Sequence, residues 1–117
     1  MTQPTDLSDI IATSEGVITS AEGSSRALLL ELGKPFCPHR AHVTWYCSYR
    51  IQLGTEVVTE SSMAGTDGIE ALTNALVALG AFVEDLRTES DVRFYGYPRF
   101  APEFFFRAGR SPTERPE

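Results

Sequence analysis

The stretch His42–Leu53 alternates between apolar and polar side chains without interruption. Successive side chains of a β-strand point to opposite faces, so this stretch predicts a strand with one packed face and one face in water. That pattern is typical of an antiparallel sheet covered on a single side. One parity holds Val43, Trp45, Cys47, Tyr49, Ile51 and Leu53, and the other holds His42, Thr44, Tyr46, Ser48, Arg50 and Gln52.

The stretch Gly65–Leu86 predicts the one long helix. Asp67 followed by Glu70 is an N-cap with a capping-box partner, and Gly65 ends the preceding element. One face of this helix is apolar, and small residues widen that face so that the helix can lie close to a sheet. The apolar face predicted from steps of three and four is Ile69, Leu72, Leu76, Leu79, Val83 and Leu86, widened by Ala71, Ala75 and Ala78.

Four further stretches predict the remaining strands. Arg26–Leu32 alternates, Glu56–Met63 returns after a Gly54-Thr55 turn, Asp91–Gly96 ends the fold, and Asp9–Thr13 is a short edge strand. We expect an α+β fold: an antiparallel meander of four to five strands with the helix packed on the Trp45 face. The chain predicts a single domain over residues 1–117, with flexible tails at 1–8 and 108–117.

The net charge of −6 is concentrated in one segment. Residues 54–86 contain no lysine or arginine, and their acids are Glu56, Glu60, Asp67, Glu70, Glu84 and Asp85. The negative charge of this segment disfavours nucleic acid as a ligand and favours a basic protein partner. The alternative is an ordinary solvated acidic face.

Aromatic side chains crowd the segment Tyr97–Phe106, where two prolines exclude a central strand or a regular helix. The segment is either a loop that closes over the core or an exposed patch. As a patch, Tyr97, Phe100 and Phe104 would contact a partner or form a homodimer.

No catalytic constellation stands out. Cys37, His39, His42 and Cys47 are zinc-ligand types, but their spacing lacks two close pairs, and His42 and Cys47 have opposite strand parity. Cys37 beside His39 is the one candidate reactive thiol, because Cys47 is expected in the core. We therefore expect no enzymatic activity, no metal and no cofactor, while a small metal- or thiol-dependent protein stays a second alternative.

The chain contains no run of about 20 apolar residues and begins with a polar segment unlike a signal peptide. We expect a cytoplasmic protein that does not bind a membrane, with both cysteines as thiols.

The helix reads G65-T-D67-G-I-E-A71-L72-T-N-A75-L76-V-A-L79-G80-A81. It resembles a family of small uncharacterised bacterial proteins whose helix reads G-x-D-x-φ-x-A-L-x-x-A-L-x-x-φ-G-A, where φ is apolar. Those proteins tend to have an L-G-x-P element before a strand with an aromatic residue and a cysteine, as in Leu32–Pro35 and Trp45–Cys47 here. The resemblance covers about Ile10–Gly96 and implies no established activity.

In size and fold these proteins are similar to bacterial immunity and antitoxin-like proteins. The main hypothesis is therefore a non-enzymatic protein-binding module that masks a basic partner through its acidic surface. The alternative is a structural or accessory module that homodimerises through its aromatic C-terminal segment. The polar sheet face of Thr44, Tyr46, Ser48, Arg50 and Gln52 is either free or covered.

Overall fold

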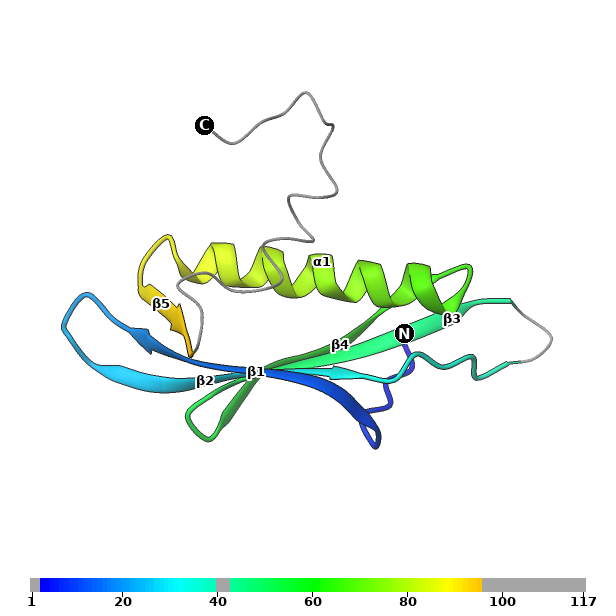
Figure 1. Cartoon of the computed structure of the whole chain (residues 1–117), viewed down its shortest axis with the longest axis horizontal. Coiled ribbons are helices and arrows are strands. Elements are labelled where there is room, and N and C mark those ends of the chain that lie inside the picture. The colour runs from blue at the N-terminus through cyan, green and yellow to red at the C-terminus, as the bar shows by residue number, and fades with distance from the viewer. Residues whose placement is uncertain (1–2, 40–42, 96–117) are drawn as a thin grey trace, which may run out of the picture.

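A computed structural model describes residues 3–39 and 43–95. Within these residues the chain forms five strands and one helix (Figure 1). In chain order they are β1 (Ile10–Thr19), β2 (Ser25–Gly33), β3 (Trp45–Leu53), β4 (Glu56–Gly65), α1 (Gly68–Leu86) and β5 (Asp91–Phe94).

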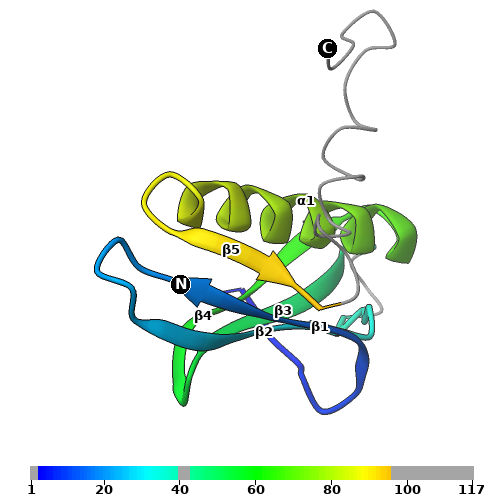
Figure 2. The ribbon, with the colours of Figure 1, turned by 60° about the vertical axis from the view of Figure 1, so that its left-hand side comes forward.

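The strands form one antiparallel sheet in the order β4-β3-β2-β1-β5. The first four strands are a meander. The helix then carries the chain back across one face of the sheet, so that β5 pairs with β1 at the opposite edge from β4 (Figure 2). The predicted α+β fold, with one helix on one face of a four- to five-stranded sheet, is confirmed.

The prediction for the first strand was wrong in extent and position. β1 continues to Thr19 rather than ending at Thr13, and it lies between β2 and β5 instead of at an edge. The strand was predicted too short because Gly16 interrupts the run of apolar residues. The structure explains why a glycine is needed at this position. A Cβ on Gly16 would overlap the Arg93 carbonyl oxygen and come within 2.9 Å of the Phe94 ring on β5.

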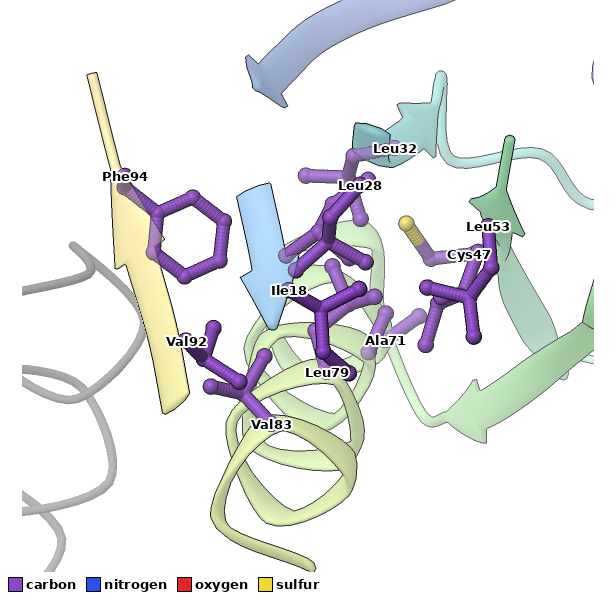
Figure 3. Packing of buried hydrophobic residues seen from close by; sticks show 13 residues of the cluster. Ile18, Leu28, Leu32, Cys47, Leu53, Ala71, Leu79, Val83, Val92 and Phe94 are labelled. Carbon is purple, nitrogen blue, oxygen red and sulfur yellow. The ribbon is translucent and has the colours of Figure 1, made fainter. Parts of the chain in front are cut away.

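The core lies between the sheet and α1 (Figure 3). The parity of β3 that begins at Trp45 faces the helix as predicted, since Cys47 and Ile51 are fully buried. Leu28 and Leu30 of β2 are also buried, which confirms the predicted leucine face. Figure 3 shows side chains of the sheet packed between the strands and the helix. The labelled members of this cluster are Ile18, Leu28, Leu32, Cys47, Leu53, Ala71, Leu79, Val83, Val92 and Phe94.

The predicted buried stripe of the helix was wrong at its first residue, Ile69, whose side chain is 78% exposed. Ala71 and Ala75, which were predicted to widen the stripe, are fully buried. Residues two apart on a helix lie about 200° apart around its axis, so Ile69 points away when Ala71 points inward. Gly65 permits this packing, because a Cβ there would be 2.5 Å from the backbone nitrogen of Ala71.

The predicted helix start is confirmed. The Oδ1 of Asp67 accepts a hydrogen bond from the backbone N–H of Glu70 at 2.7 Å. Glu70 reaches back one residue further than a standard capping box, because its Oε1 accepts from the N–H of Thr66 at 2.7 Å. Both carboxylates therefore have a structural role at the helix N-terminus.

Candidate partner-binding surface

The six acidic residues proposed as partner-binding from the sequence do not share one surface. Asp67 and Glu70 lie at the first turn of α1, whereas Glu84 and Asp85 lie in its last turn. With a rise of 1.5 Å per residue, Glu70 and Glu84 are about 21 Å apart along the helix axis. The other two, Glu56 and Glu60, belong to β4.

Two of these acids have arginine partners from earlier strands. Glu56 is 3.6 Å from Arg26 of β2, and Glu60 is 3.6 Å from Arg50 of β3. Glu84 and Asp85 are exposed and make no ion pair with another residue of the described ranges. The three aromatic candidates, Tyr97, Phe100 and Phe104, lie outside the described residues.

The face of the sheet away from α1 is covered at one end by the N-terminal segment. This segment, residues 3–8, was expected to be a loose tail, but it lies against β3 and β4. The backbone N–H of Asp6 donates to the Oγ of Ser48 at 2.8 Å, and the Oγ of Ser62 donates to the carbonyl of Pro4 at 2.6 Å. Ser48 is fully buried as a result, so this part of the polar face is covered. We call residues 3–8 the strap.

Beyond the strap, a charged row crosses β2, β3 and β4. The Nε of Arg50 donates to Oε1 of Glu31 at 2.7 Å, and Gln52 donates to the same oxygen at 3.5 Å. The other end of the Arg50 guanidinium is 3.6 Å from Glu60. The hydrogen bond to Glu31 is the main reason why the pKa of Arg50 is raised above its ordinary value. Arg50 thus neutralises part of the acidic charge on this face.

Next to this row the sheet surface has a hollow of about 370 Å³. It forms where side chains on this face are short or missing, at Ala27 and Gly54, and the backbone of Gly16 also lines it. Tyr95, just after β5, stands at its rim with 67% of its surface exposed. The remaining residues that line it are Thr13, Glu15, Leu28, Leu29, Glu31 and Gln52.

We define the open face by the residues that line this hollow from the side away from α1, together with Arg50, Val57 and Glu60. Register places Glu15 opposite Leu29, Leu29 opposite Gln52, and Gln52 opposite Val57, so one band crosses four strands. Val57, like Tyr95, is a large exposed apolar side chain. The open face therefore combines exposed apolar groups with carboxylates.

Sequence reasoning missed Glu15, Leu29, Glu31 and Tyr95 as site residues. The alternation of Arg26–Leu32 already contained the signal for two of them, because Leu29 and Glu31 have the parity opposite to the buried leucines. Glu15 was missed because the first strand was predicted to end before it.

A second hollow, of about 410 Å³, lies between the strap and the start of β3. It is lined by Asp6, Asp9, Lys34, Pro35, Phe36, Cys37 and Trp45. Hydrogen bonds from the side chain and the backbone of Ser8 lower the pKa of Asp6. The Sγ of Cys37 lies 3.6 Å from the backbone carbonyl of His39 and can donate to it.

The two cysteines are thiols, as expected, and they lie in different environments. Cys47 is fully buried and donates to the carbonyl of Gly33 at 3.3 Å. Burial raises the pKa of the Cys47 thiol to about 11, so it is protonated and unreactive at neutral pH. No group of three His, Cys, Asp or Glu side chains within residues 3–39 and 43–95 is placed to hold a metal ion. His42 lies outside these ranges.

In the part of the chain that the structure describes, no helix combines the length and the apolar character needed to cross a bilayer.

A family model described as Domain of unknown function (DUF6968) matches residues 17–96. The match includes the end of β1, all later elements and most of the hollow, but it excludes the strap. Comparisons with curated proteins and with solved structures found no match.

Proposed function

This chain belongs to the DUF6968 family, and we propose that it is a non-enzymatic protein-binding module that binds a basic partner through its open face. The observation that carries this proposal is the exposure of Tyr95 and Val57 among the carboxylates of Glu15, Glu31 and Glu60. Protein interfaces combine aromatic and apolar anchors with a polar rim in this way.

The charge of the protein supports a basic partner. The net charge is −6, and residues 54–86 contain no lysine or arginine. Such a field attracts a positively charged protein over distances comparable to the Debye length and accelerates association. Arg50 lies between Glu31 and Glu60, so positive and negative charges alternate across the open face. This pattern would set the orientation of the partner.

We further propose that the protein acts as bacterial immunity or antitoxin-like proteins do, by masking a basic protein inside the cytoplasm. Its small size and its acidic excess support this role. A protein of this kind is normally encoded beside its target, so the neighbouring gene supplies the first partner to test.

The test is co-expression of the full chain with the basic product of the neighbouring gene, followed by calorimetry at increasing salt. We expect a complex whose Kd rises at least about tenfold between about 0.1 M and about 1 M salt, since the Debye length falls from about 10 Å to about 3 Å. The absence of a complex, or a Kd indifferent to salt, would contradict the proposal.

Light scattering of the protein alone separates this role from the homodimer alternative. A monomer is expected for a module that masks another protein. A dimer that dissociates when Tyr97, Phe100 and Phe104 are changed to serine would favour a structural module that pairs through its aromatic C-terminal segment.

A further inference from the structure

We propose that the hollow on the open face is the anchor pocket for an arginine side chain of the partner. That a partner protein supplies this arginine rests on the proposed function. That the side chain is an arginine rests on the chemistry of the hollow. Its volume of about 370 Å³ is at the lower end of the range of ligand pockets, about 300–1,000 Å³.

Two carboxylates line the hollow from neighbouring strands. Glu15 of β1 is exposed and makes no ion pair within the described ranges. Register places Glu15 opposite Leu29, and Glu31 opposite Thr13, so the two acids are diagonal neighbours. Diagonal side chains on one face of an antiparallel pair are about 7–8 Å apart at their backbones, which leaves room for a planar cation between the carboxylates.

Glu31 has an acceptor to spare. Both of its hydrogen bonds, from Arg50 and from Gln52, go to Oε1, and no described donor reaches Oε2. The Glu31 side chain as a whole is only 13% exposed. A carboxylate in such a position favours a further charged donor, because charge-assisted hydrogen bonds strengthen away from water.

The other walls fit the rest of an arginine side chain. Ala27 and Leu29 supply an apolar surface for its methylene stem, and the ring of Tyr95 stands at the rim. A guanidinium is weakly hydrated and stacks on aromatic faces, while the compact ammonium of lysine is strongly hydrated and binds as a point charge. A neutral apolar side chain would leave Glu15 without a counter-charge, whereas Glu31 would keep its ion pair with Arg50. Arginine therefore fits the lining best.

The experiment uses the full-length, isotope-labelled protein and follows its amide signals by NMR during titration with N-acetyl-arginine amide. We expect saturable shifts at Glu15, Leu29 and the side-chain amide of Gln52. N-acetyl-lysine amide should bind at least about threefold more weakly, and the norleucine analogue should cause no shifts at these positions. Absence of saturable shifts there, or shifts spread evenly over the acidic residues, overturns the proposal.

A matched pair of charge-removing variants controls for general electrostatics. Glu15→Gln should weaken arginine amide at least about fivefold, because it removes a charge-assisted partner. Glu84→Gln removes the same charge from an exposed position on α1 and should leave the affinity unchanged. If both variants weakened arginine amide equally, the ligand would be held only by the overall negative charge of the protein. That result would overturn the assignment of the hollow as an arginine pocket.

Failure of this inference and failure of the proposed function can be told apart. If the basic partner binds with the expected salt dependence but arginine amide does not bind the hollow, the anchor is wrong and the function stands. If arginine amide binds but no basic partner does, the function is wrong. If a variant with Arg99, Arg107 and Arg110 changed to glutamine binds arginine amide more tightly, this chain's own C-terminal segment occupies the hollow, and the assignment to a partner is overturned.

Discussion

At the scale of single residues, the smallest side chains determine how closely the helix approaches the sheet. A Cβ on Gly65 would meet backbone atoms of Glu70 and Ala71, which cannot move aside as a flexible side chain can. We predict that Gly65→Ala lowers the free energy of unfolding by about 1–3 kcal/mol, measured by urea denaturation.

Gly68→Ala is the matched control for this prediction, since it adds the same methyl group three residues later. Its Cβ would lie 3.4 Å from the ring of Trp45, an ordinary contact, and alanine favours the helix. The free energy of unfolding should be unchanged or rise by up to about 1 kcal/mol. An equal loss in both variants would mean that the close approach at Gly65 is not limiting.

The buried thiol of Cys47 predicts a loss of stability in alkali. Its pKa is raised from 9.0 to about 11, so the folded state favours the neutral thiol. This contribution is fully present below about pH 9 and is lost as the pH rises toward 11, by up to about 3 kcal/mol. Subtracting the pH profile of Cys47→Ala from that of the natural chain isolates the effect. Identical profiles between pH 9 and pH 11 would contradict the burial of this thiol.

At the scale of elements, strand and capping signals located four of the five strands and the helix to within a few residues. They worked because one face of β2 and of β3 is buried and the other is more exposed, as the alternating burial along β2 shows. They failed for β1, whose interior position depends on pairing with β5 some 75 residues later in the chain. The same signals did not predict that Ile69 is exposed. The rotation of the helix about its own axis is set by its contacts with the sheet, which the sequence pattern does not contain.

The strap is an element without regular structure whose attachment can be tested. Ser48→Ala removes the acceptor for the Asp6 N–H, and Ser62→Ala removes the donor to Pro4. Each change should cost about 1 kcal/mol of stability. Hydrogen exchange of the Asp6 amide should accelerate in the double variant. Ser61→Ala, on the other face of β4, should leave that exchange rate as it was. Equal rates in all variants would show that the two serines do not hold the strap.

At the scale of the whole molecule, charge could be read from the sequence but its arrangement could not. The acids of residues 54–86 are neighbours in the chain, yet they lie at both ends of the helix and on β4. Their arginine partners, Arg26 and Arg50, come from outside that segment. The hollow joins residues of β1, β2 and β3 to Tyr95, so it exists only once the sheet has formed.

The most direct test of the open face as the binding surface compares two exposed apolar residues on opposite sides of the molecule. Tyr95 lies at the rim of the hollow, and Ile69 lies on the helix. Using the basic partner from the co-expression experiment, calorimetry should show that Tyr95→Ala raises Kd at least about tenfold, or about 1.4 kcal/mol, while Ile69→Ala leaves it unchanged. A larger loss for Ile69→Ala would place the partner on the helix side and contradict the account.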